Sequence, residues 1–211
     1  MSSLEKINFI AIIGPDGAGK TTVANKIEKI YDGKAIHKAA NFEILPTFTE
    51  IKNFLTLNKQ VKRNEEGYKG FHSGMQQKPN HVFKSFILIL WYSIDLNLGR
   101  IKLAKAKKDG VLYCFARYFY DYYFQVANLN APHWLLDFFL KVITKPDIVF
   151  YIKREASDIY EGKPELSIEE IMRQQNVIES LAKRNENFFI VDGSQGIPNM
   201  MEIIEKKMSD A

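Results

Sequence analysis

The sequence predicts an α/β fold with a mainly parallel, doubly wound sheet. Two observations lead to this prediction: short apolar runs of strand length alternate with segments of helical period, and a glycine-rich turn joins the first strand to the first helix. The chain has 211 residues, which is enough for one full core and too few for two ordinary domains. We therefore expect a single domain over residues 1–211.

The elements follow one another in a regular order. The run INFIAIIG at residues 7–14 is continuously apolar and β-branched, as a strand buried on both faces should be. In the next segment, residues 20–31, Val23, Ile27 and Ile30 recur at helical spacing. The other expected strands are residues 34–37, 111–116, 147–152 and 187–193, and the other expected helices are residues 81–108, 133–143, 167–184 and 199–208.

Two segments allow further predictions: residues 60–80 and the long helix at residues 81–108. Residues 60–80 are polar, contain glycine and show no periodicity, so we expect a mobile surface loop there. The helix at 81–108 carries a long apolar face, and Gly110 just beyond it is a stop signal. This face could belong to the core or supply the interface of a homodimer. Its residues are Phe83, Ile87, Leu90, Ile94, Leu98 and Ile101.

The composition is that of a globular protein with a mildly basic surface. The net charge is +4 and the pI is about 8.9, which fits an ordinary surface or a cleft that attracts phosphates. No dense basic run interleaved with aromatics suggests nucleic-acid binding. We find no secretory signal, and the most apolar stretch, residues 85–94, is too short to span a membrane. With a single cysteine, Cys114, we expect a cytoplasmic protein.

The turn GPDGAGKT, from Gly14 to Thr21, fits the phosphate-loop pattern G-x-x-x-x-G-K-[ST]. Its glycines permit backbone N–H groups to turn inward around phosphate oxygens. In such a loop Lys20 would reach the β- and γ-phosphates, and the Thr21 hydroxyl would ligate Mg²⁺. The following helix adds partial positive charge at its N-terminus. The alternative is a glycine-rich turn that binds nothing.

Asp16 lies inside this loop, where a carboxylate is poorly placed to hold a phosphate. We interpret it as a residue that hydrogen-bonds a second substrate, such as a sugar hydroxyl, or as a cap of the following turn. No base-reading pattern of GTPases, such as Asn-Lys-x-Asp, is present. These features favour a small-molecule kinase among the proteins that share the loop.

The stretch FIAIIGPDGAGKTT resembles the opening of the thymidylate kinase family, in which an acidic residue, Gly, Ala, Gly, Lys and a Ser/Thr pair are typical. Four further segments look like later parts of that family, so the resemblance covers most of the chain. GVLYCFARYFYD is similar to its strand ending in Asp-Arg-Tyr, KPDIVFYI to its Pro-Asp strand segment, GKPELSIEEIMRQQ to its lid, and FFIVDGSQGI to its last strand and adenine-side loop. The likeness is greatest to divergent thymidylate-kinase-like proteins.

This resemblance implies a P-loop fold of three α/β/α layers with five parallel strands and a lid near residues 153–173. It also implies ATP and Mg²⁺ as cofactors and transfer of the γ-phosphoryl group of ATP to a nucleoside monophosphate. The implied ATP-binding residues are Gly14, Gly17, Ala18, Gly19, Lys20, Thr21 and Thr22, with Ser194 and Gln195 near the adenine.

On the acceptor side, Asp16 matches the acidic residue that holds the acceptor sugar, and Arg117 matches the arginine that holds the acceptor phosphate. Lys20 and Arg117 are the expected catalytic cations. Tyr118 or Tyr122 is expected to face the cleft and stack on a base, while the other aromatic residues between 115 and 124 are expected in the core.

Three positions depart from the family pattern. Ala116 replaces the strand-end Asp, Ala39 stands at the substrate-side Arg, and Gly162 stands at the lid Arg. A missing carboxylate typically costs about 10²–10⁴ in rate, and a missing arginine up to about 10³–10⁵. Lys163 and Arg173 are the candidates to replace the lid arginine, although a lysine lacks the bidentate fork.

Ala116 has three explanations that the sequence leaves open. It is a natural loss in a protein that only binds nucleotides, a natural change with the chemistry moved elsewhere, for instance to Asp121, or a substitution introduced to trap a complex. A kinase for another small acceptor, such as a sugar, is a further alternative. His37 ends the second expected strand, where acceptor contacts are expected, but a lone histidine is more often structural.

Overall fold

A computed structural model describes residues 7–47, 50–51 and 79–211 of the chain. Within these residues one sheet has the strand order β2-β3-β1-β4-β5, and each neighbouring pair of strands is parallel. The predicted α/β class with a parallel sheet is confirmed. The strands are β1 (Phe9–Ile13), β2 (Ala35–Lys38), β3 (Leu112–Phe115), β4 (Ile148–Lys153) and β5 (Phe188–Asp192).

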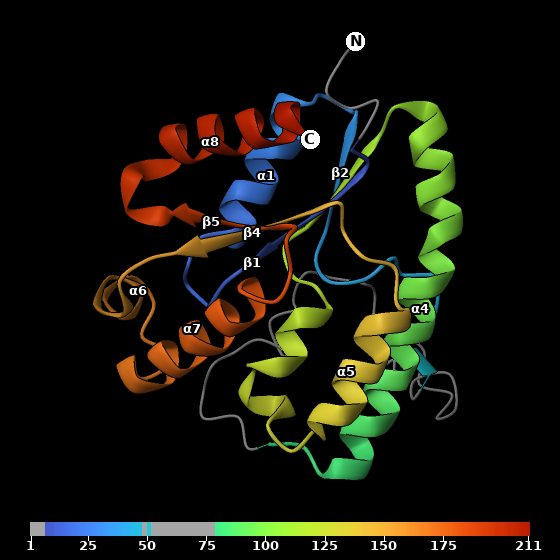
Figure 1. Cartoon of the computed structure of the whole chain (residues 1–211), viewed down its shortest axis with the longest axis vertical. Helices are drawn as coiled ribbons and strands as arrows, with labels where there is room; N and C mark the ends of the chain where they lie inside the picture. The colour runs from blue at the N-terminus through green and yellow to red at the C-terminus, as the bar shows by residue number, and fades with distance from the viewer. Residues whose placement is uncertain (1–6, 48–49, 52–78) are drawn as a thin grey trace.

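Helices cover both faces of this sheet (Figure 1). One face packs against α1 and α8, and the other packs against α4, α5 and α7. The helices are α1 (Lys20–Ile30), α4 (Val82–Asp109), α5 (His133–Val142), α6 (Ala156–Gly162), α7 (Ile168–Ala182) and α8 (Gly196–Asp210).

The central strand β1 shows why the chain folds in three layers. All of its residues are buried, and its side chains alternate between the two apolar cores. Phe9 and Ala11 point to the core under α4, α5 and α7, whereas Ile10 and Ile12 point to the core under α1 and α8. Because parallel strands all end at the same edge, the segments that follow β1, β3, β4 and β5 gather there.

Most predicted elements occur within a few residues of their expected bounds, and two differ. α8 begins at Gly196, before the predicted start at residue 199. A short helix, α6, occupies part of the predicted lid at residues 153–173. The loop predicted at residues 60–80 lies outside the described residues except at its end, where the Asn80 amide donates to the Ala127 carbonyl at 2.9 Å.

The structure excludes one of the two alternatives left open for the apolar face of α4. The apolar face from Phe83 to Ile101 is exposed, so it does not form the core. The buried face instead includes small and polar side chains, because α4 also holds the segment after β2. The buried Asp95 carboxylate accepts hydrogen bonds from the backbone N–H groups of Phe42, Ile44 and Leu45 at 2.7–2.8 Å. The buried residues of α4 are Ser85, Leu88, Ile89, Ser93, Asp95, Leu96, Gly99, Leu103 and Ala106.

By length and composition alone α4 could cross a membrane, with a mean hydropathy of 1.3 over its most apolar window. This is weak support for a membrane span, since the inner face of the helix packs on the sheet and carries the buried Asp95.

We predict that Gly99→Ala destabilises the fold. A Cβ at Gly99 would lie 2.0 Å from Cδ2 of Phe42, whose fully buried ring is confined by the rings of Phe9 and Phe115. Overpacking of this kind typically costs about 1–3 kcal/mol of unfolding free energy, measurable by urea denaturation. Gly162→Ala is the control, because no heavy atom lies within 4 Å of its Cβ position. Equal stability of the two variants would contradict this packing.

Candidate functional site

The glycine-rich turn connects β1 to α1 at the edge of the sheet where the strands end (Figure 1). Gly17 and Gly19 have φ angles of 92° and 96°, a left-handed conformation that favours glycine. A Cβ at Gly17 would lie 3.0 Å from Cγ2 of Ile159 in α6, so glycine also permits this close approach. No heavy atom lies within 4 Å of the Cβ position of Gly19. The turn is therefore packed on one side and open on the other.

The open side of the turn is the N-terminus of α1. Gly19 offers no side chain to cap the helix, and the first turn carries no acidic residue. Thr21 and Thr22 are exposed on that turn. N–H groups at a helix N-terminus, together with the positive end of the helix dipole, attract phosphate oxygens. The geometry therefore fits a phosphate loop.

Lys20 is buried, and its ammonium group turns back into the loop. Its Nζ donates to the carbonyl oxygens of Gly14 and Pro15, both at 2.8 Å, and lies 3.4 Å from Oδ1 of Asp16. Burial, followed by the nearby Arg117 cation, lowers the pKa of Lys20 to about 8. Lys20 is thus mostly charged at neutral pH. To bind a phosphate, the Lys20 ammonium group would have to leave the Gly14 and Pro15 carbonyl oxygens.

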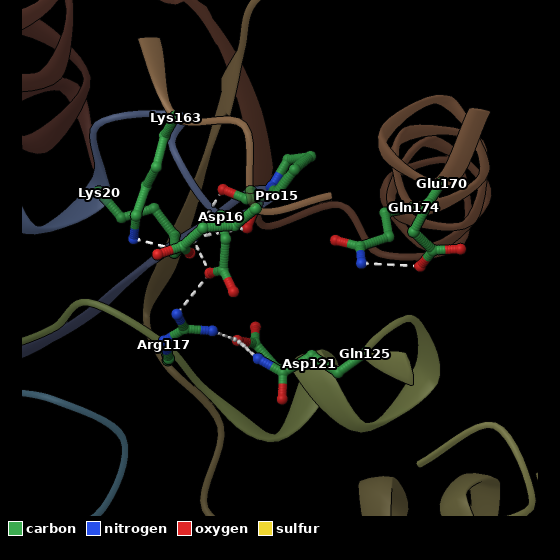
Figure 2. Close-up of polar contacts among 11 residues, drawn as sticks. Pro15, Asp16, Lys20, Arg117, Asp121, Gln125, Lys163, Glu170 and Gln174 are labelled. Carbon is green, nitrogen blue, oxygen red and sulfur yellow. Dashed lines mark hydrogen bonds and ion pairs between the residues drawn. The ribbon is translucent and has the colours of Figure 1, made fainter. Parts of the chain in front are cut away.

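Arg117 lies between two carboxylates, as Figure 2 shows. Its Nη2 donates to Oδ1 of Asp16 in the loop, and its Nη1 lies 3.3 Å from Oδ2 of Asp121. Gln125 Nε2 donates to the same Asp121 oxygen at 3.1 Å. The segments after β1 and β3 are thereby joined through side chains of residues that are 101 positions apart. Asp16, Arg117 and Asp121, three residues predicted for the acceptor side, thus lie together, with Arg117 in contact with both carboxylates.

Burial and charge set the protonation of this group. Burial lowers the pKa of Arg117, but the carboxylates of Asp16 and Asp121 outweigh it and raise that pKa overall. Burial raises the pKa of Asp121 to about 6, although the Arg117 and Lys20 cations oppose the rise. Oδ1 of Asp121 is buried without a hydrogen-bond partner among the described residues. A proton or a ligand donor at this oxygen would relieve its desolvation.

Ala116 directly precedes this group and carries no chemistry of its own. It is 4% exposed and packs in the core shared with Ile12 and Cys114, and its N–H donates to the Lys38 carbonyl at 2.9 Å. Asp121, which reaches Arg117 from the next turn, is the predicted replacement for the carboxylate missing from position 116.

The predicted lid touches the loop directly. Ala18 of the loop packs with Ala156, Ile159 and Ile171 of α6 and α7 in a small apolar cluster. The Cβ of Lys163 lies 3.3 Å from the position that a Cβ at Gly17 would take. Nζ of Lys163 pairs with Oε2 of Glu165 at 2.9 Å, and the lysine side chain remains 48% exposed. Lys163, a candidate to replace the lid arginine, thus lies beside the loop but is paired with an acidic residue.

Arg173 was a candidate to replace the lid arginine, but its guanidinium is engaged in hydrogen bonds to Glu170 and Phe124. Its Nε and Nη2 donate to the two carboxylate oxygens of Glu170, both at 2.7 Å, and Nη2 also donates to the Phe124 carbonyl. These contacts fasten α7 to the segment after Asp121. The structure gives Arg173 the role of a clamp in this conformation and does not place it on the loop.

A pocket of about 390 Å³ opens on the other side of the loop. Of the two residues predicted near the adenine, Ser194 lines this pocket, whereas Gln195 does not and donates instead to Asp192 at 3.2 Å. The pocket thus combines the start of α1 with the segments that follow β4 and β5. It is lined by Ala18, Gly19, Thr22, Arg154, Asp158, Gly193, Ser194, Gly196, Ile197 and Met200.

Arg154 is the main lining residue that the sequence did not reveal. A Cβ at Gly193 would lie 2.4 Å from its Cγ, so glycine at 193 makes room for the arginine side chain. Arg154 Nε is buried and has no hydrogen-bond partner among the described residues. Arg154 lines the pocket together with the apolar residues Ile197 and Met200, and a planar guanidinium can stack on a flat ring. The available signal in the sequence was weak: Arg154 is a basic residue two positions beyond the strand predicted at residues 147–152.

Two other predicted site residues, His37 and Tyr118, are not part of the group formed by Lys20, Asp16, Arg117 and Asp121. His37 contacts α1 through Glu28, whose Oε1 accepts from the His37 amide at 3.3 Å, and burial lowers the pKa of the imidazole. Tyr118 is 2% exposed, with its ring among those of Phe9 and Phe115, so it is a core residue and does not face the cleft.

Comparisons with known proteins support the fold. No family model matches the sequence, and no curated protein matches it. Solved structures do match, among them the crystal structure of thymidylate kinase from Ehrlichia chaffeensis, with a TM-score of 0.54 and 17% sequence identity. That match covers 94% of this chain and 96% of the other. At this identity the likeness shows that the two chains share a fold.

We predict a pH dependence of stability that originates from Asp121. The folded protein keeps the Asp121 proton up to about pH 6, whereas the unfolded chain releases it near pH 4. Unfolding free energy should therefore fall from about pH 4 to 6 in the wild type relative to Asp121→Asn, by roughly 2–3 kcal/mol. Urea denaturation of both proteins at several pH values measures this difference. A difference that does not change across this range would contradict the buried, proton-holding Asp121.

Proposed function

We propose that this protein is an ATP-dependent kinase that transfers a phosphoryl group to a nucleoside monophosphate. The observation that carries the proposal is the arrangement along one sheet edge. A pocket of about 390 Å³, a phosphate loop with Lys20, and Arg117 held by Asp16 and Asp121 lie along this edge. These are the parts that a donor base, the transferred phosphate and an acceptor phosphate require. The shared fold with a thymidylate kinase supports the same reading.

On the donor side, the adenine is proposed to lie in the 390 Å³ pocket against Arg154, with Ser194 at its edge. The phosphates then reach the N-terminus of α1, where Lys20 leaves the Gly14 and Pro15 carbonyls to neutralise them. Mg²⁺, held by the phosphates and the Thr21 hydroxyl, supplies further charge neutralisation when bound.

On the acceptor side, Arg117 is proposed to receive the monophosphate. The guanidinium fork already presents two donors, and a phosphate can replace the Asp121 contact, which at 3.3 Å is a long one. Asp16 then remains beside Arg117 and can accept a hydrogen bond from the acceptor sugar. Asp121, with its raised pKa and an unpartnered oxygen, is the group best placed to take the proton that Ala116 cannot.

A nucleotide-binding protein without turnover is the second candidate. Ala116 is a buried methyl group, Arg173 is fixed by Glu170, and Lys163 is paired with Glu165, so both candidates for the lid arginine are engaged by acidic residues. A kinase for a sugar-like acceptor is a third candidate, because Asp16 would accept a hydrogen bond from a sugar hydroxyl in that case too. In each of these readings we expect the protein to act in the cytoplasm.

The first experiment tests whether Mg·ATP binds at the glycine-rich loop or elsewhere on the surface. We expect Lys20→Ala to weaken binding of Mg·ATP by about tenfold or more, because it removes the buried cation that meets the phosphates. Lys26→Ala is the matched control, an exposed lysine on the same helix, and should leave binding unchanged. Calorimetric titration measures both. Equal binding by the two variants would contradict the proposed phosphate site.

The second experiment tests whether the protein turns over ATP and whether Asp121 does the work of the carboxylate missing at position 116. ADP release is measured with a panel of nucleoside monophosphates and sugars, for the wild type, Asp121→Asn and Ala116→Asp. If the chemistry has moved to Asp121, Asp121→Asn should lower kcat by about 10²–10⁴. If the protein is only a binder, the wild type should bind ATP without releasing ADP. Turnover that Asp121→Asn leaves intact would exclude Asp121 as the proton acceptor.

A further inference from the structure

The pocket beside the phosphate loop is lined by one positive and one negative side chain that do not pair with each other. Arg154 follows β4 and Asp158 lies on α6, and both line the pocket of about 390 Å³. They are only four positions apart in the chain, yet no ion pair joins them to each other or to another described residue. The proposed function uses the plane of Arg154 and leaves Asp158 without a role.

Arg154 is held in place while its guanidinium lacks a partner among the described residues. Its carbonyl oxygen accepts a hydrogen bond from Nε2 of Gln175 on α7 at 2.6 Å. Its side chain occupies the space that a Cβ at Gly193 would need. Nε is buried without a hydrogen-bond partner in this part of the chain. A buried donor without a partner is costly, and an acceptor on a ligand would remove that cost.

Asp158 is held beside the loop by its neighbour Ile159. Ile159 is fully buried, and its Cγ2 lies 3.0 Å from the position of a Cβ at Gly17, so α6 packs closely against the loop. The Asp158 side chain is half-buried and accepts no hydrogen bond from another described residue. The helix dipole favours an acidic residue in the first turn of α6, but it does not require that residue to line a pocket. Asp158 can therefore offer its acceptor oxygens to a ligand there.

The rest of the pocket has the character of a base site. Its volume lies within the range of about 300–1,000 Å³ that is usual for small-molecule pockets. Ala18, Ile197 and Met200 give it apolar surface for a flat ring. Gly19 and Thr22 line the same pocket, so a base in it can be joined directly to phosphates at the loop.

The charges of Arg154 and Asp158 discriminate between the two purine bases. Guanine has two acceptors, O6 and N7, on one edge and two donors, N1–H and the N2 amino group, on the next. Arginine supplies only donors and a carboxylate only acceptors, so both edges of guanine can be matched. On the same edges of adenine, the N6 amino group would face the guanidinium and the N1 lone pair would face the carboxylate.

We propose that Arg154 and Asp158 select guanine as the donor base, so that GTP serves as a phosphoryl donor and binds more tightly than ATP. This rests on the proposed function for the phosphate site and the reaction, and adds to it the choice of base. ATP still binds through its phosphates, because Lys20 and the loop amides do not read the base. The sequence lacks the GTPase pattern Asn-Lys-x-Asp, and the carboxylate comes here from α6.

A series of nucleotides tests this selection on the wild-type protein. Calorimetric titration with Mg·GTP should give a Kd about tenfold or more below that of Mg·ATP, the scale of one good bidentate contact to a base. Mg·ITP should bind more weakly than Mg·GTP, because its base keeps N1–H and O6 but lacks the N2 amino group. Nucleoside diphosphate release with a nucleoside monophosphate acceptor, measured at low donor concentration, should follow the same order.

Asp158→Asn should exchange the preference and not simply lose it. Asparagine has one acceptor and one donor where aspartate has two acceptors, and xanthine has an oxygen where guanine has its N2 amino group. The variant should bind Mg·XTP about tenfold or more tightly than the wild type does, and Mg·GTP correspondingly more weakly. A misfolded variant would not gain affinity for Mg·XTP. Glu161→Gln, which changes an exposed carboxylate on the same helix, is the control and should alter neither affinity.

Three results would contradict this selection. Equal affinity of the wild type for Mg·GTP and Mg·ATP would overturn the choice of guanine and leave the proposed kinase activity standing. Equal weakening of both nucleotides by Asp158→Asn would assign the carboxylate to the ribose hydroxyls, which both share, and would overturn it too. If the wild type binds none of these nucleotides, the phosphate site itself is absent and the proposed function fails as well.

Discussion

The ion pair between Asp16 and Arg117 holds the site together. It joins the turn after β1 to the turn after β3, two strands that are neighbours in the sheet. The pair is possible because parallel strands place both turns at one edge, and it is mostly buried, with 19% and 15% of the two side chains exposed. Removing either partner would leave the other charge mostly buried with only its longer contact, Asp16 to Lys20 or Arg117 to Asp121, which is more costly than loss of a surface ion pair.

This pair also links the two halves of the proposed reaction. Asp16 lies within the phosphate loop and contacts Lys20, while Arg117 contacts Asp121. Two cations and two carboxylates thus neutralise one another in the absence of phosphates. When phosphates bring their own negative charge, both cations can turn to them without leaving the site. The same network explains how a chain with Ala116 can retain a charged acceptor site, since its carboxylate comes from Asp121 on the next turn.

Much of this arrangement could be predicted from the sequence, because it depends on local patterns. The β1 run is apolar at every position, and the glycines, Lys20 and Thr21 have fixed spacing, so strand, loop and helix follow from neighbouring residues. Arg117 and Asp121 were likewise expected near a strand end.

The residues that sequence reasoning missed depend on contacts between distant segments. The buried face of α4 could not be recognised, because both sides of this helix carry large apolar residues and the true inner face holds Asp95. That carboxylate is buried only because amides of residues 42–45 satisfy it. Arg154 belongs to the pocket because Gly193, far along the chain, makes room for it. Tyr118 turned inward because Phe9 and Phe115 surround it.

Hydrogen exchange of the backbone amides, with and without Mg·ATP, tests the central claim most directly. If nucleotide phosphates occupy the loop, amides of residues 17–22 should exchange more slowly when Mg·ATP is bound, and those near Ser194 should follow. Amides of β2, away from the proposed site, should be unchanged. If the loop amides exchange at the same rate with saturating Mg·ATP, the phosphate loop does not bind a nucleotide and the account is wrong.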